Sequence, residues 1–178
     1  MPSSRARTVC GIGGDRTQFV RRRFAADVVQ LHPRLAVIKI GVNNTGDLDE
    51  WDPAKRRPAG AIEEEVVDDV TAVVDIARAA AIPAAVCSIL PINIASRTTT
   101  AERNALIVRI NDRLRGMAHS AGAVYVNYHA HLVGEDGRTL RAELADDGLH
   151  PHVLGYEIMA RVLLETLERA GIDAIRAR

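Results

Sequence analysis

The sequence predicts an α/β fold with a parallel sheet, and two features of the chain support this expectation. Short apolar runs such as 35–41 ("LAVIKIG") and 84–90 ("AAVCSIL") alternate with longer segments of helical periodicity such as 61–81. The run 35–41 has the β-rich apolar composition expected of a strand buried on both faces. Regular alternation of strands and helices implies a parallel sheet with right-handed crossovers. We expect a single domain, residues 1–178.

The remaining elements extend the same alternation along the chain. We expect strands over 8–10, 35–41, 84–90 and 123–127 and helices over 17–31, 61–81, 101–121 and about 154–170. Pro33 ends the first helix, because proline cannot continue the hydrogen bonding of an α-helix. Gly122 ends the third, since glycine commonly closes a helix. No internal repeat or low-complexity block interrupts this order.

The composition indicates a globular chain and argues against two classes of partner. Hydrophobic residues make up 47% and charged residues 26%, which suits a packed core. Nucleic-acid binding is not expected, because the formal net charge is zero and aromatic residues are only 3%. No run of about 18 apolar residues occurs, so we expect no membrane span.

The start of the chain and its two cysteines favour a cytoplasmic protein. The segment "MPSSRARTVCGIGG" lacks the apolar stretch of a signal peptide. Cys10 and Cys87 form no recognisable disulfide framework. Both fall in expected strands, and we interpret them as buried free thiols. A reducing, cytoplasmic environment is therefore expected.

One group of side chains resembles a metal site. His129 and His131 form an H-x-H pair in a loop, with Asp136 nearby in the sequence. Such a pair alone is a weak signal, and we interpret these histidines as structural or solvated. We expect neither a metal ion nor another cofactor.

Two polar segments follow expected strands, at the edge of the sheet where ligands of open α/β folds bind. The first, "GIGGD" at 11–15, could present backbone N–H groups to an anion, although a tight turn explains the glycines equally well. The second, "GVNN" at 41–44, places Asn43 and Asn44 after a strand. Asparagine amides are good donors to an oxyanion because they are fixed dipoles. Asparagine is also common in turns, which is the alternative interpretation.

A third segment, "DDGLHP" at 146–151, places Asp147 three residues before His150. At this spacing, the two side chains can reach each other across one turn. A carboxylate that accepts from one imidazole nitrogen leaves the other nitrogen free to act as a general base. Pro151 keeps His150 extended and outside the helix that follows. The alternative is a helix-entry aspartate beside a surface histidine.

Taken together in this order, the three segments resemble the sequence blocks of the SGNH (GDSL-type) hydrolase family. The resemblance assigns the oxyanion hole to the N–H of Gly14 and the amide of Asn43. It makes Asp147 and His150 two members of a catalytic triad. Asn44 stands where the family usually has an aspartate, and we consider it a substrate-binding residue. The implied activity is hydrolysis of a small-molecule ester or another acyl substrate.

The resemblance, which spans about residues 8–168, also implies a fold. The family has a three-layer α/β/α arrangement around a parallel, flavodoxin-like sheet whose first strand is central. That strand ends in G-D-S, whose serine is the nucleophile, and no G-D-S occurs in this sequence. None of the serines present is expected on the sharp strand-to-helix turn that such a nucleophile needs. We therefore expect the sheet without its central strand, and the nucleophile is not identified.

Loss of that strand would leave unpaired backbone groups, each costing about 1–3 kcal/mol. Three explanations are open. The gene product begins upstream, another chain or a second copy supplies the strand, or strand 8–10 pairs directly with strand 35–41. The alternative to a hydrolase is a non-hydrolytic relative, which binds a ligand or uses His150 in acid–base chemistry without an acyl-enzyme.

Overall fold

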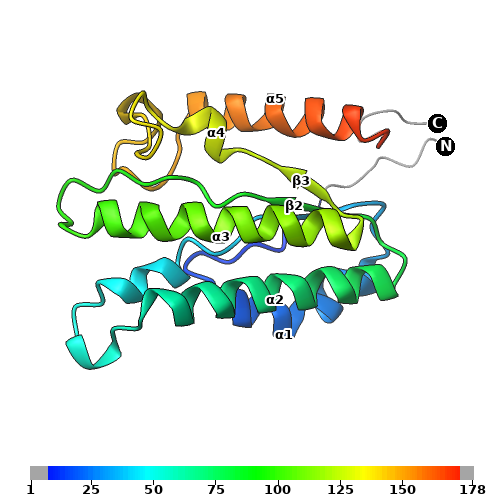
Figure 1. The fold of residues 1–178 in the computed structure, drawn as a ribbon. Helices are drawn as coiled ribbons and strands as arrows, with labels where there is room; N and C mark the ends of the chain where they lie inside the picture. Colours follow the sequence, from blue (N-terminus) through cyan, green and yellow to red (C-terminus); the bar gives the residue numbers. More distant parts are fainter. Residues whose placement is uncertain (1–7, 173–178) are drawn as a thin grey trace.

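The computed structural model describes residues 8–172 and shows an α/β fold (Figure 1). The strands are β1 (Ala36–Ile38), β2 (Ala84–Cys87) and β3 (Val124–Val126). The α-helices are α1 (Thr17–Asp27), α2 (Ala59–Ala79), α3 (Thr100–Ala121), α4 (His129–Leu132) and α5 (Val153–Arg169). Short 3-10 helices are η1 (Val29–Leu31), η2 (Asn44–Leu48), η3 (Pro53–Lys55) and η4 (Ala142–Leu144). In this part of the chain, no helix is long and apolar enough to cross a membrane.

The strands form one parallel sheet in the order β1-β2-β3. Ala36 of β1 pairs with Ala84 of β2, and Ala85 of β2 pairs with Val124 of β3. All four residues of β2 are buried, as expected for a central strand that is covered on both faces. The predicted parallel α/β arrangement is therefore confirmed, with a short sheet.

The sheet separates two apolar clusters. On one face, Ile38 and Val86 pack with the buried sides of α2 and α3. On the other face, Cys87 and Val126 pack with α5 through residues such as Met159. Figure 1 shows the same division, with α4 and α5 on one side of the strands and α2 and α3 on the other.

The helical cover is uneven over the two faces. α5 packs over β3, at one edge of the sheet. At the opposite edge, the Val37 side chain of β1 is 46% exposed although it lies in a strand. Among the described residues, β1 pairs only with β2, so its outer edge carries no ladder. One edge of the sheet and the adjoining part of one face are therefore open.

The predicted strand over 8–10 is wrong. These residues form no ladder, and the Val9 side chain is 88% exposed. The segment is held instead against α1, where Arg23 donates to the Cys10 carbonyl at 2.8 Å and the Cys10 thiol donates to the Asp27 carbonyl at 3.2 Å. A strand exists only where a neighbour pairs with it, and within residues 8–172 none pairs with this segment. Direct pairing between 8–10 and β1 is thereby excluded, and Cys10 is partly exposed and not a strand residue.

The observed bounds of the helices agree with the predicted bounds more closely than those of the strands do. α2, α3 and α5 lie within two residues of their predicted bounds, and Gly122 closes α3 with φ +70°. The first predicted helix divides into α1 and η1, because Val28 leaves the helical region with φ −121°. His32 then ends η1 in the left-handed conformation at φ 47°, one residue before Pro33.

Candidate active site

Asp147 and His150 form a compact turn before α5. Oδ2 of Asp147 lies 2.6 Å from Nδ1 of His150. Oδ1 of the same carboxylate accepts from the backbone N–H groups of Leu149 and His150, each at 2.8 Å. The structure therefore brings this pair together with the geometry of a carboxylate that orients an imidazole.

The hydrogen bonds to Asp147 also fix its charge. They hold the pKa of the carboxyl group well below its usual range, chiefly through the backbone N–H of His150, then through its side chain and the N–H of Leu149. An ionised carboxylate only accepts hydrogen bonds, so Nδ1 of His150 must carry the proton. Nε2 then keeps its lone pair when the ring is neutral, and the His150 side chain is 78% exposed. The ring can thus take a proton from a group that approaches from solvent.

Gly148 fixes the position of this turn in the fold. Its carbonyl accepts from the backbone N–H of Asn93 at 2.7 Å, which docks the turn on the loop after β2. Gly148 adopts φ +71°, and a Cβ atom there would lie 1.9 Å from the Asn93 carbonyl oxygen. Only glycine fits this contact without displacement of one of the two loops.

The glycine turn and Asn43 are joined at the carboxyl end of β1. The Asn43 side chain donates from Nδ2 to the carbonyl of Asp15 at 2.8 Å. Gly14, immediately before Asp15, is exposed and has φ +79°. A primary amide has two N–H donors, so the Asp15 contact leaves one for another acceptor. No hydrogen bond links Gly14 or Asn43 to Asp147 or His150 within residues 8–172.

Asn44 faces the interior and not the solvent. It is 0% exposed, and its Oδ1 accepts from the backbone N–H of Thr17 at 3.2 Å. Its Nδ2 donates to Oγ1 of Thr17 and to Oε1 of Glu65, both at 3.0 Å. These bonds tie the start of α1 to the loop after β1. Asn44 therefore lies beneath the surface and stabilises the two segments that carry Gly14 and Asn43.

A second support for Asn43 comes from Arg103 of α3, which the sequence patterns did not indicate. Its Nη2 donates to Oγ1 of Thr45 at 3.3 Å, and this hydroxyl donates to the Val42 carbonyl at 2.7 Å. Arg103 is 6% exposed, and Asp49 lies 3.8 Å away. Burial lowers the pKa of Arg103, and Asp49 opposes this effect. Arg103 and Thr45 are 58 residues apart, so no local spacing could reveal their contact.

No described serine is in contact with His150. Ser88 is 0% exposed, and its Oγ accepts from the backbone N–H of His129 at 2.8 Å. Ser96 and Ser120 are exposed, and neither hydrogen-bonds to His150 in residues 8–172. Ser3 and Ser4 lie outside the described residues.

His129 and Asp136, considered above as parts of a metal site, take part in other interactions. His129 begins α4, and burial lowers its pKa. Asp136 is engaged in its own turn, where hydrogen bonds from the Thr139 hydroxyl and from the backbone N–H groups of Arg138 and Thr139 lower its pKa to about 2. Across residues 8–172, no three His, Cys, Asp or Glu side chains are placed to hold a metal ion together.

Solved structures share this fold. A GDSL-like lipase from Bacteroides thetaiotaomicron matches with a TM-score of 0.76 and 25% identity, over 90% of this chain and 74% of that one. An acetylxylan esterase from Geobacillus stearothermophilus matches with a TM-score of 0.71 and 20% identity, over 94% of this chain and 73% of that one. No curated protein matches the sequence.

The Geobacillus esterase has also been solved as catalytic mutants at a serine, an aspartate and a histidine. The last two stand at its positions 191 and 194, which is the spacing of Asp147 and His150 here. A model of the GDSL-like lipase/acylhydrolase family matches residues 3–158. Because this match spans most of the 178 residues, the chain belongs to the GDSL-like lipase/acylhydrolase family.

Proposed function

We propose that this protein hydrolyses an ester or another acyl bond of a small molecule. The observation that carries the proposal is the Asp147–His150 pair, with 2.6 Å between Oδ2 and Nδ1 and the carboxylate held by two backbone N–H groups. The residue spacing in the catalytic mutants of the Geobacillus esterase supports the same assignment.

In the proposed mechanism, His150 is the general base. Its Nε2 takes the proton of the nucleophile as the nucleophile attacks the carbonyl carbon, and it returns a proton to the leaving alcohol. Asp147 keeps the ring in the required tautomer and stabilises the imidazolium that forms. The N–H of Gly14 and the remaining amide hydrogen of Asn43 donate to the oxyanion of the tetrahedral intermediate.

The nucleophilic serine is proposed to come from outside these 178 residues. The open edge of β1 is where a serine-bearing strand could add, because its outward backbone groups lack partners among the described residues. Such a strand would extend the sheet next to β1. If it runs parallel to β1, its carboxyl end would lie beside the end of β1, where the Asn43 loop is found.

A second candidate function is ligand binding without acyl transfer. The specific observation in its favour is that Ser88, Ser96 and Ser120 make no contact with His150. Under this alternative, the exposed Nε2 of His150 would serve recognition or acid–base chemistry only.

Hydrolysis of p-nitrophenyl acetate by the purified chain tests whether these 178 residues contain a working nucleophile. We compare the wild type with His150→Ala and use His119→Ala, an exposed histidine at the end of α3, as the matched control. Loss of a general base lowers the rate by about 10²–10⁴. Turnover that His150→Ala abolishes and His119→Ala retains supports the hydrolase. Background rates in all three proteins would contradict hydrolysis by this chain alone, a result that an external serine and the second function both predict. Turnover that then appears when a serine-bearing strand is joined to the chain, and that His150→Ala abolishes, supports the hydrolase, whereas continued background rates favour the second function.

A further inference from the structure

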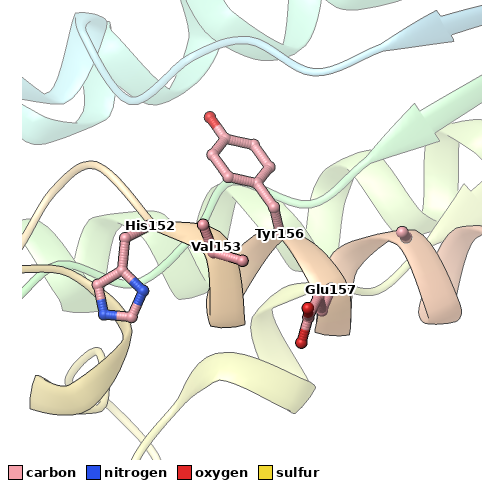
Figure 2. Close-up of a pocket in the computed structure, with 5 residues that line it drawn as sticks. His152, Val153, Tyr156 and Glu157 are labelled. Atoms are coloured by element: carbon pink, nitrogen blue, oxygen red, sulfur yellow. The ribbon is translucent and has the colours of Figure 1, made fainter.

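Helix α5 carries an apolar stripe on its outer side. Val153 is 73% exposed, Tyr156 is 59% exposed and Leu164 is 40% exposed. With Ala160, these residues follow one another at intervals of three and four, so they lie along one side of the helix. Figure 2 shows Tyr156 projecting away from the helix beside Val153, over a shallow hollow that Ala160 also lines. We call these four residues the α5 stripe.

The α5 stripe is distinct from the side of α5 that joins the core. Gly155, Met159 and Val162 are buried and face the sheet. A helix at a protein surface normally has one apolar side, with charged residues opposite. α5 has a second apolar side, and among the described residues nothing covers it. Apolar residues grouped in this way indicate an interaction surface.

We propose that the α5 stripe binds the same stripe of a second copy of this chain, forming a two-fold symmetric dimer of antiparallel helices. In such an arrangement, one surface serves both subunits, so each contact occurs twice. The helix has 17 residues and is therefore about 25 Å long, enough for a continuous helix–helix contact.

The order of residues along the stripe is self-complementary. With Ala160 at the two-fold axis, its small side chain lets the two helices approach closely. Tyr156 and Leu164 lie four residues on either side of Ala160. Tyr156 then meets Leu164 of the partner subunit, and the reciprocal contact follows by symmetry. The large aromatic ring is thus matched with an aliphatic side chain, and two rings do not collide at the centre.

The charges beside the stripe are complementary in the same arrangement. Glu157 and Arg161 are exposed, and both lie next to Ala160 along one border of the stripe. In an antiparallel pair centred on Ala160, Glu157 faces Arg161 of the partner subunit. A parallel two-fold pair would bring opposite borders of the two stripes together, so Glu157 and Arg161 of the two copies would not meet. The charge pattern therefore selects the antiparallel dimer.

Sedimentation velocity of the whole chain tests this dimer. A monomer has a mass of 19.3 kDa, and we expect the wild type to form a species of twice that mass. Tyr156→Arg should raise the dissociation constant at least about tenfold, because it places a charge in the apolar contact. Leu154→Arg is the matched control, since Leu154 is 44% exposed on α5 but lies off the stripe. A wild type that stays monomeric, or a dimer that Leu154→Arg weakens as much as Tyr156→Arg, overturns the proposal.

Charge-reversal and cysteine variants test the orientation. Glu157→Arg and Arg161→Glu should each weaken the dimer, and the double variant should restore it. Ala160→Cys should form a disulfide-linked dimer under mild oxidation, because the two residues meet at the axis. Leu154→Cys should not form such a disulfide-linked dimer. Cross-linking through Leu154→Cys alone would contradict the antiparallel arrangement centred on Ala160. So would a double variant whose dimer is no more stable than the dimer of either single variant.

Discussion

Gly148 lies where the Asp147–His150 turn touches the loop after β2, so it should control the position of the histidine. A Cβ atom at this residue would lie 1.9 Å from the Asn93 carbonyl oxygen. We expect Gly148→Ala to cost about 1–3 kcal/mol from overpacking, in addition to the strain of positive φ. Gly137→Ala is the matched control, because Gly137 has φ +65° and open space around it. Urea unfolding of both variants measures the difference. Equal losses would show that the Asn93 contact does not constrain the turn.

At the residue scale, the hydrogen bonds of Asn44 explain why this chain has an amide where the family usually has an aspartate. Its Nδ2 donates to Oε1 of Glu65 at 3.0 Å, whereas a carboxylate could not donate. We expect Asn44→Asp to destabilise the fold by about 1–3 kcal/mol, because two acceptors would then face each other in a buried site. Glu65→Gln in the same chain restores a donor and should recover stability. A double variant as unstable as Asn44→Asp alone would contradict this account.

At the scale of the element, β2 supplies a pH-dependent contribution to stability. Burial raises the pKa of the Cys87 thiol in this strand from 9.0 to about 12. Below pH 9.0 the thiol is protonated in both states, so its contribution is fully present. Between that pH and about 12 the unfolded chain ionises first, and stability falls as pH rises.

The β2 thiol is tested by urea unfolding at about pH 8 and about pH 10.5. Cys87→Ala should lose about 1–2 kcal/mol less than the wild type between these conditions, because the thiol that drives part of the loss is gone. Cys10→Ala is the control, since Cys10 is only partly buried and lies outside the sheet. If Cys87→Ala shows the same alkaline loss as the wild type, the thiol does not drive it.

The elements that could be predicted from sequence are those whose cause is local. The helical periodicity of α2 and α3 is visible within each segment, and Gly122 marks an end by its own conformational freedom. Strand pairing is not local. The segment 8–10 has the composition of a strand, yet it forms none because no neighbour pairs with it. α4 and the 3-10 helices η2, η3 and η4 were not predicted, since their lengths are too short to show a period.

The same distinction applies to the candidate site. The Asp147–His150 contact spans three residues, so its spacing is recognisable in the sequence alone. The support of Asn43 by Asp15 and of Thr45 by Arg103 joins segments 28 and 58 residues apart. Such contacts follow from the packing of α1 and α3 around the strand ends. Sequence patterns therefore indicate the candidate reacting groups and leave out the residues that position them.

At the scale of the whole molecule, the outer edge of β1 has no ladder partner among the described residues, and we expect this edge to govern unspecific association. Exposed edge strands offer unpaired backbone groups to other chains, and a charged side chain there blocks such pairing. Val37 lies on this edge in β1 and is 46% exposed, so Val37→Lys should be tolerated within about 0.5 kcal/mol. We expect it to raise the protein concentration at which light scattering increases. It should leave the proposed α5 dimer unchanged, because that contact lies on a helix.

Val108→Lys is the control for added charge, since Val108 is 36% exposed on α3, away from the β1 edge. Equal improvement in both variants would mean that net charge, and not the edge, limits association. A large loss of stability in Val37→Lys alone would mean that the edge is already covered in solution. Together with the sedimentation of the α5 variants, this comparison separates association through backbone pairing at β1 from association through side chains on α5.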